Sequence, residues 1–146
     1  MSTGLQKRIE EYMDECRSCT IATASVDGQP AASTVFFKNR GVDIYFNTGS
    51  DTQKMHNILA NPRVAVVMHA GPAPARDQDI KGIQYIGQGE ILPDANVPEA
   101  PEAVTARHRA FNSAAAGSSV IVKVTPEKIY LVDYSKGFRH RDHLEF

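Results

Sequence analysis

Residues 47–54, Asn-Thr-Gly-Ser-Asp-Thr-Gln-Lys, form the stretch of this sequence with the clearest chemical potential. A strand is predicted to end here, a glycine permits a tight turn, and a helix is predicted to begin. The first turn of a helix offers unpaired backbone amides and the positive end of the helix dipole, which together bind anions. Thr48, Ser50 and Thr52 add hydroxyl donors, and Lys54 adds a positive charge. The stretch is therefore a candidate phosphate site.

A purely structural interpretation of the same residues stays open. Ser50 and Gln53 have the spacing of a capping box, in which each side chain satisfies a backbone amide at the start of a helix. Asp51 in the first turn already complements the helix dipole. The run is not a Walker loop, because the Gly-Lys-Ser/Thr ending of that motif is absent.

Two cysteines, Cys16 and Cys19, have the spacing of a redox motif. They follow a predicted helix, whose negative C-terminal end disfavours a thiolate. Two cysteines cannot form a four-cysteine zinc site within one chain. The favoured interpretation is a pair of packed or half-exposed thiols, with no metal site.

The tail contains His140 and His143, and the other histidines are scattered along the sequence. A metal site needs further ligands, so a solvated or substrate-facing tail is the favoured interpretation. Neither a Ser/His/Asp order nor a pair of carboxylates indicates hydrolytic chemistry.

The elements that must position these residues follow from the apolar spacing and the turn residues. Residues 5–16 and 50–61 are predicted helices, and residues 102–111 a short helix. Asp27-Gly28 predicts a two-residue hairpin turn, because both central positions of that turn need positive φ. Gly87 and Gly89 indicate a bulge or a close approach of another group to the backbone. Pro126-Glu127 is taken as the turn of a last hairpin, and residues 114–119 as a mobile stretch. The predicted strands cover residues 20–24, 29–38, 43–47, 63–69, 83–92, 120–125 and 128–134.

These elements predict a mainly β protein: about seven strands in antiparallel Greek-key order form a split β-barrel with peripheral helices. The 146 residues fit one domain, with an N-terminal helix and a C-terminal tail.

The charge balance narrows the class of function. Lys and Arg number 16 against 17 Asp and Glu, so the net charge is −1. This excludes a strongly basic nucleic-acid binder and gives no reason to expect a membrane surface as partner. The apolar runs are far shorter than the roughly 20 residues of a membrane span. Residues 1–8 lack the apolar stretch of a signal peptide, so a cytoplasmic location is expected.

Several short motifs occur here in a characteristic order and spacing. They are Thr-Ile-Ala-Thr-Ala (20–24) before Asp-Gly-Gln-Pro (27–30), the run 33–38, and Ile-Tyr-Phe-Asn-Thr (44–48). Lys54 followed by Asn-Pro-Arg-Val-Ala (61–65), and then Gln84, complete the set. Over residues 8–134 the chain resembles the FMN-binding split-barrel family, the pyridoxamine 5'-phosphate oxidase-like proteins.

The resemblance implies a homodimer that binds FMN in a groove between its subunits. The strand 33–38 would line the isoalloxazine, with Lys38 near its polar edge, and Gln84 would hydrogen-bond the cofactor. Gln53 and Lys54 stand where the family has the pair of residues that binds the FMN phosphate. The implied cofactor-binding residues, with the Thr52 hydroxyl added, are Ser33, Thr34, Val35, Phe36, Phe37, Lys38, Asn47, Thr48, Thr52, Gln53, Lys54 and Gln84. In the tail, Phe138 and His140 are interpreted as a cover on the substrate face, or as a seal of the dimer.

Two positions depart from the oxidase pattern: Ser33 and Gln53 stand where the oxidase has arginine. Lys54, the helix amides and the hydroxyls must then carry most of the phosphate contact, and Arg63 and Arg141 are candidates to help. The oxidase's anion-binding set for its substrate is not found here, so pyridoxamine 5'-phosphate is not the expected substrate.

The predicted function is that of an FMN-dependent oxidoreductase. It moves a hydride or electrons between a reduced nicotinamide or deazaflavin donor and an unidentified small molecule, with no catalytic residue assigned. The alternatives are a non-catalytic FMN carrier or sensor, and a haem-binding or flavin-free split-barrel protein.

Overall fold

Six antiparallel strands close into a barrel, and a seventh strand lies outside it. The computed structural model describes residues 4–113 and 118–146. The strand order is β3-β2-β1-β4-β5-β6-β7, and a further pairing of β3 with β6 closes the ring. The strands are β1 (Ser18–Ala24), β2 (Pro30–Arg40), β3 (Asp43–Gly49), β4 (Arg63–Met68), β5 (Lys81–Ile91), β6 (Ser119–Asp133) and β7 (Arg141–Glu145).

The order of the first four strands is that of a Greek key. β1, β2 and β3 follow one another as hairpins, and β4 returns to pair with β1. The predicted fold class, a mainly β Greek-key split barrel with peripheral helices, is confirmed. The helices are α1 (Gly4–Glu15), α2 (Gln53–Ala60) and α3 (Glu102–Ser113), with short 3₁₀ turns η1 (Asp77–Asp79), η2 (Asp94–Glu99) and η3 (Tyr134–Lys136).

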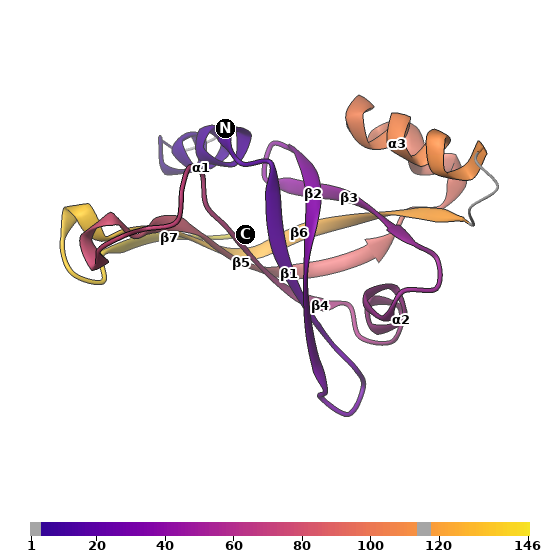
Figure 1. The fold of residues 1–146 in the computed structure, drawn as a ribbon, viewed down its shortest axis with the longest axis horizontal. Helices are drawn as coiled ribbons and strands as arrows, with labels where there is room; N and C mark the ends of the chain where they lie inside the picture. The colour runs from indigo at the N-terminus through magenta and orange to yellow at the C-terminus, as the bar shows by residue number, and fades with distance from the viewer. Residues whose placement is uncertain (1–3, 114–117) are drawn as a thin grey trace.

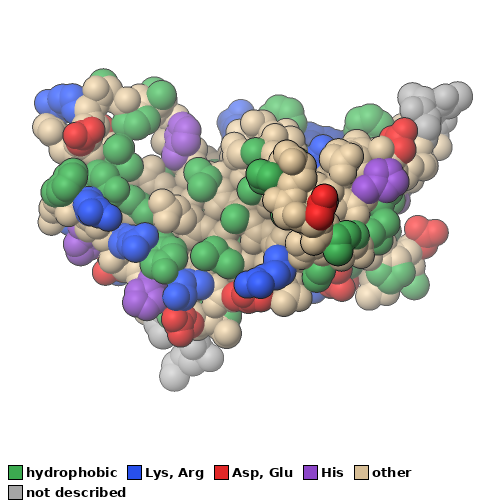
Figure 2. Space-filling view, turned by 90° about the horizontal axis from the view of Figure 1, so that it is seen from below, with side chains coloured by type: hydrophobic (Ala, Val, Ile, Leu, Met, Phe, Trp, Pro, Cys, Tyr) green, Lys and Arg blue, Asp and Glu red, His purple; other side chains and the backbone are tan. Residues whose placement is uncertain are grey.

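The helices lie around the barrel rather than between its strands. Figure 1 shows α1 over the barrel, and α2 and α3 both on the right of the view. On the left, β7 and the paired halves of β5 and β6 (residues 81–86 and 128–133) extend as an arm. In Figure 2 this arm is the left-hand lobe of the molecule. Among the described residues, no helix combines the length and apolar character needed to cross a bilayer.

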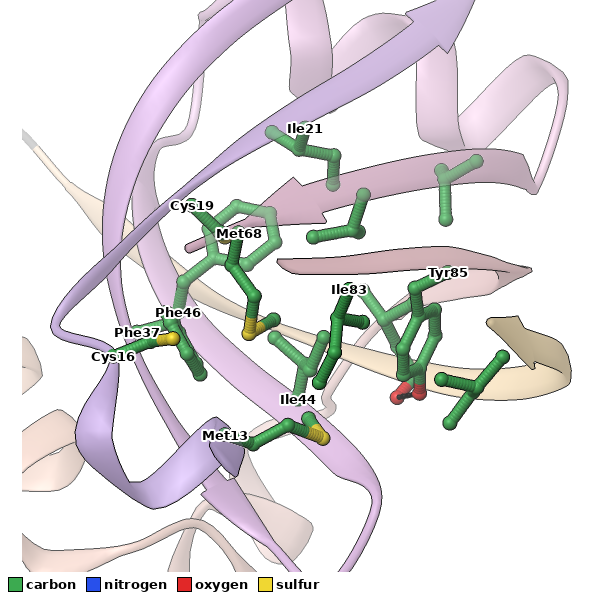
Figure 3. Packing of buried hydrophobic residues seen from close by; sticks show 14 of the residues in the cluster. Met13, Cys16, Cys19, Ile21, Phe37, Ile44, Phe46, Met68, Ile83 and Tyr85 are labelled. Carbon is green, nitrogen blue, oxygen red and sulfur yellow. Dashed lines mark hydrogen bonds between the residues drawn. The ribbon is translucent and has the colours of Figure 1, made fainter. Parts of the chain in front are cut away.

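The barrel core is filled by the inward-facing residues of the strands and closed by α1. Strand β4 shows the underlying alternation, with every second side chain buried. Figure 3 shows Cys16, which directly follows α1, beside Phe37 and Phe46 of β2 and β3, and Met13 of α1 belongs to the same cluster. All of these side chains are buried.

Both cysteines are buried free thiols, as the sequence predicted. Burial raises the pKa of Cys16 to about 11 and that of Cys19 to about 12. Raised pKa values keep both thiols protonated and unreactive at neutral pH, because the thiolate is the nucleophile.

The predicted hairpin around Pro126 and Glu127 is wrong, because β6 runs unbroken through both residues. The partner strand β5 shifts register between Ile86 and Gly87, which pair with Lys128 and Pro126, so Glu127 is the extra residue of a bulge. The bulge absorbs the proline that would otherwise interrupt the ladder. The seventh strand is instead β7, in the segment that the sequence suggested was only a tail.

The Asp27-Gly28 turn also differs from the two-residue turn predicted. Ser25 and Gln29 are joined by a backbone hydrogen bond of 3.0 Å, and Gly28 donates back to Ser25 O. Only Gly28 has positive φ, at +91°, so the loop resembles the three-residue hairpin that ends in a left-handed glycine. Of the predicted mobile stretch, residues 114–117 lie outside the described residues.

The bulge generates a stability prediction. A Cβ at Gly87 would overlap the carbonyl oxygen of Thr125, which is backbone and cannot move aside, whereas a Cβ at Gly89 would sit 3.4 Å from Ile58 Cγ2. Gly87→Ala should lower the free energy of unfolding by roughly 3 kcal/mol or more. Gly89→Ala, two residues along the same strand, should change it by less than about 1 kcal/mol. Urea denaturation of both variants checks this, and equal losses would contradict the bulge as described.

Candidate functional site

A cavity of about 850 Å³ lies on the outside of the barrel, where α2 begins and α3 passes overhead. Residues from β2, the end of β3, the turn into α2, α3 and the start of β6 meet around it. The lining residues are Thr34, Val35, Phe36, Asn47, Thr48, Gly49, Ser50, Asp51, Thr52, Lys54, Arg107, Phe111, Ser118 and Ser119. The candidate phosphate stretch 47–54 therefore supplies most of one wall.

Strand β2 forms the floor of the cavity through its alternating side chains. Thr34 and Phe36 point outward, and the Phe36 side chain is 64% exposed. Val35 and Phe37 point inward, because successive side chains of a strand face opposite sides. The outward residues of β2 thus give the cavity a floor that is partly aromatic and partly hydroxylic.

The turn from β3 into α2 is held by threonine hydroxyls. Thr52 is the N-cap of α2: its Oγ1 accepts from the backbone amide of Met55 at 3.4 Å. The same Oγ1 lies 2.8 Å from Thr48 Oγ1 and 3.1 Å from Gly49 O. This network fixes the first turn of α2 at the edge of the cavity.

The predicted capping box of Ser50 and Gln53 is wrong. The helix begins at Gln53, three residues later than expected, so Ser50 lies before the Thr52 cap and pairs through its hydroxyl with Ser118. Gln53 is the first helical residue, and its Nε2 donates to Asn57 Oδ1 at 2.8 Å. Sequence spacing favoured Ser50, but Thr52 has the β-region backbone that a cap requires.

Helix α3 forms the roof, a role that no residue pattern predicted. Asn47 Nδ2 donates to Val104 O at 3.2 Å, which ties the helix to the end of β3. Arg107 lies over the Phe36 ring, with its Cζ 5.3 Å from the ring centroid. The short helix at 102–111 was predicted, but its docking is a long-range contact that local periodicity does not encode.

Two features of the lining suit a polar ligand. Asn47 Oδ1 is buried without a hydrogen-bond partner, although a buried acceptor normally has one. Lys54 and Arg107 are the cations among the described lining residues, and Asp51 is the carboxylate. Within the described part of the chain, neither cation forms an ion pair.

Seven of the residues predicted to bind the cofactor line this cavity, and five do not. The lining set is Thr34, Val35, Phe36, Asn47, Thr48, Thr52 and Lys54. Of the others, Phe37 packs in the core, Ser33 is a half-buried residue on the inner side of β2, and Lys38 is exposed beyond Phe36. Gln53 is engaged with Asn57, and Gln84 is exposed on β5.

The tail residues lie away from the cavity within one chain. Phe138 is 79% exposed, with its ring 6.1 Å from that of Tyr134, and His140 Nε2 lies 3.5 Å from Asp142. Arg63 and Arg141, the suggested helpers for the phosphate, do not line the cavity either. The guanidinium of Arg141 instead lies over the Tyr130 ring at 4.4 Å.

An uncharged outer face adjoins the cavity across four neighbouring strands. Cross-strand pairs align its residues in two rows, and Thr34 belongs both to this face and to the cavity. The side chains are exposed or half-buried. The uncharged face consists of Ala32 and Thr34 of β2, Thr20 and Ala22 of β1, Ala65 and Val67 of β4, and Gln84 and Ile86 of β5.

Comparison with known proteins gives one matching family. The sequence model of the family described as Pyridoxamine 5'-phosphate oxidase matches residues 5–133. Two curated relatives are both named pyridoxine/pyridoxamine 5'-phosphate oxidase. The one from Cupriavidus metallidurans is 38% identical over 62 residues, which cover 42% of this chain and 29% of the relative. The one from Bordetella petrii is 39% identical over 74 residues, which cover 49% of this chain and 34% of the relative. The matched region thus spans about a third of each relative.

Solved structures with the same fold have varied names. A haem-binding protein from Mycobacterium smegmatis has a TM-score of 0.77 at 15% identity, over 99% of this chain and 59% of that one. General Stress Protein 26 from Bacillus anthracis has a TM-score of 0.70 at 18% identity, over 99% and 100%. The haem storage protein HutZ from Vibrio cholerae has 0.69 at 14%, over 88% and 95%. At these identities the likeness shows the fold alone.

The capping assignment generates the prediction of this section. Thr52→Ala should lower the free energy of unfolding by about 1 kcal/mol, because it removes the side chain that satisfies the first turn of α2. Thr52→Ser keeps a capping hydroxyl and should recover most of the loss. Ser50→Ala is the matched control, with a smaller effect expected in the same denaturation experiment. A larger loss for Ser50→Ala than for Thr52→Ala would restore the original capping box.

Proposed function

This chain belongs to the pyridoxamine 5'-phosphate oxidase family, and from that membership we propose that it is an FMN-binding oxidoreductase acting as a homodimer. The observation that carries the proposal is the cavity itself. It joins the exposed Phe36 ring of the floor to the first turn of α2, where Lys54 adds a positive charge. A flavin nucleotide needs this combination of an apolar bed for its ring and a cationic, amide-rich end for its phosphate.

The residues at the α2 end fit a phosphate. Gly49 and Ser50 precede the helix, and Thr52 caps it, so the amides of the first turn stand at the cavity wall. Ser50, Ser118 and Ser119 add hydroxyl donors, and Lys54 adds charge. These groups supply the charge-assisted hydrogen bonds that phosphate oxygens accept most strongly.

Other lining residues fit the ring and the sugar chain. Phe36 and Phe111 present aromatic surface, and Thr34 presents a hydroxyl. Asn47 Oδ1 is a buried hydrogen-bond acceptor without a donor in the described structure. Flavins carry an imide N–H and several ribityl hydroxyls, and either would satisfy it.

Bound FMN would supply two-electron chemistry, taking a hydride from a reduced nicotinamide or deazaflavin and passing the electrons to a small molecule. The residues of this chain bind and orient the group, and α3 shields one side of it from water. We assign no residue the role of acid or base. We propose a substrate other than pyridoxamine 5'-phosphate, because Lys54 and Arg107 are the cations among the described lining residues, and the cofactor phosphate would engage them before a second phosphate could.

Haem is the second candidate, since two structural neighbours have names that refer to haem. Iron in haem takes His, Cys, Met or Tyr as axial ligand. The described lining residues include none of these types. The donor set therefore favours FMN, and a haem would need its ligand from another chain.

We propose that a second copy of the chain covers the uncharged face. Val67 is 52% and Ile86 42% exposed there, and apolar exposure in a contiguous uncharged area is typical of an interface. The face shares Thr34 with the cavity, so a second chain would also wall the flavin ring. On this arrangement Gln84, Phe138 and His140, which lie off the cavity in their own chain, face the cavity of the second copy. Free thiols at Cys16 and Cys19 suit a reducing cytoplasm.

The cofactor is tested by the absorption spectrum of the purified protein before and after FMN is added and the excess removed. Oxidised flavin bands should remain with the protein. Lys54→Ala should weaken FMN binding roughly tenfold, because it removes a charged partner of the phosphate. Lys7→Ala, an exposed lysine on α1, is the control and should bind as the wild type. No retained flavin under either condition would defeat the proposal and direct the search to haem.

The assembly is tested by sedimentation at micromolar concentration. The wild-type chain should sediment as a dimer, whereas Val67→Lys should sediment as a monomer and lose FMN, because it buries a charge in the proposed interface. Val26→Lys changes an equally apolar side chain, 80% exposed in the β1–β2 loop, and should stay dimeric. A monomeric wild-type chain would contradict the shared site.

A further inference from the structure

The charge on the ligand exceeds what Lys54 alone can balance. A phosphate monoester carries between one and a half and two negative charges at neutral pH, by analogy with phosphorylated side chains, which carry about −1.5 to −2. Lys54 offers one positive charge, and Asp51 at the same wall offers a negative one. A second cation would balance the remaining charge, and among the described lining residues the other cation is Arg107.

Arg107 is held in a way that leaves its donors free. Its guanidinium lies 5.3 Å from the centroid of Phe36, an aromatic ring on the cavity floor. Stacking of this kind restrains the planar group without using its N–H donors. Arg109, two residues along α3, differs: its Nη2 donates to Glu102 Oε1 at 3.0 Å. On the same helix, Arg109 is therefore ion-paired with a carboxylate, whereas Arg107 lines the cavity.

The helix that carries Arg107 is anchored by residues of the cavity itself. Asn47 Nδ2 donates to Val104 O at 3.2 Å, and Ser119 N donates to Asn112 Oδ1 at 2.8 Å. Both anchors lie one or two turns from Arg107 on α3. The position of the guanidinium is consequently set relative to the β3 end and the β6 start, where the hydroxyl and amide donors also lie.

We propose that Arg107, presented from α3, is the second cation of the phosphate site beside Lys54. This inference rests on the proposed binding of FMN and adds a specificity-determining residue to it. Arg107 makes the cavity discriminate flavin mononucleotide from riboflavin, which has the same ring and sugar chain but no phosphate. Asp51 opposes this selectivity through like-charge repulsion of the phosphate.

The test is a fluorescence titration of the flavin-free protein with FMN and, separately, with riboflavin. Wild type should bind FMN more tightly than riboflavin. Arg107→Gln should raise the Kd for FMN roughly tenfold or more and leave the Kd for riboflavin within about twofold. Arg109→Gln, on the same helix but outside the cavity, should leave both values unchanged. Asp51→Asn should lower the Kd for FMN and not that for riboflavin, because it removes repulsion of the phosphate.

The outcomes separate this inference from the proposed function. If wild type binds FMN and Arg107→Gln binds it equally well, Arg107 does not contact the phosphate and the cofactor proposal stands. If Arg107→Gln weakens FMN and riboflavin alike, Arg107 acts on the ring or on the docking of α3, which also overturns the inference. Thermal unfolding of both arginine variants distinguishes a helix that has come loose. If wild type binds neither flavin, the proposed function and this inference fail together.

Discussion

The antiparallel pairing of β3 with β6 is the contact on which the candidate site depends. It closes the barrel, and its last pairs join Asn47 to Ile121, Thr48 to Val120 and Gly49 to Ser119. The strand that leads into α2 is thereby joined to the strand that follows α3, so residues of both helices line one cavity although some fifty residues separate them in sequence. Without this pairing the threonine-capped turn, the serine hydroxyls and the roof helix would belong to different parts of the surface.

A second constraint is the continuity of β6 past Pro126. One strand serves both the closed barrel, through β3 and β5, and the arm, through β5 and β7. The bulge at Gly87 makes this possible, because it lets the Thr125 carbonyl approach where a side chain would otherwise stand. The bulge changes the direction of the paired strands β5 and β6 without ending their hydrogen bonding. The arm therefore extends away from the barrel (Figure 1). A hairpin at the same residues would have left no long partner for β7.

Local chemistry made much of this predictable, and the errors lie where distant segments decide the outcome. The strand β4 and the helix α1 depend on patterns within a few residues, and both elements were predicted correctly. The cap at Thr52 was missed because Ser50 has an equally suitable side chain, and only the backbone geometry of the β3–α2 turn separates them. Pro126 was interpreted as a turn because the glycine that accommodates it lies on another strand. Arg107 was not identified as a site residue because its contact is with Phe36, about seventy residues earlier, and no local pattern near Arg107 predicts that contact.

The charge and the exposure of the cavity together connect ligand binding to assembly. Its cations, Lys54 and Arg107, come from α2 and α3 of one chain, so on the proposed function a single chain would supply the phosphate contacts. Its apolar floor opens at Thr34 onto the uncharged face, so the ring of a bound flavin would remain partly in water until a second chain covers it. On the proposed arrangement, flavin binding buries apolar surface that dimerisation also needs buried. Coupling between two binding equilibria is reciprocal. If FMN stabilises the dimer by a given free energy, the dimer therefore strengthens FMN binding by the same amount. In the proposed dimer, a second copy would complete the cavity, so a single chain need not enclose the flavin ring alone.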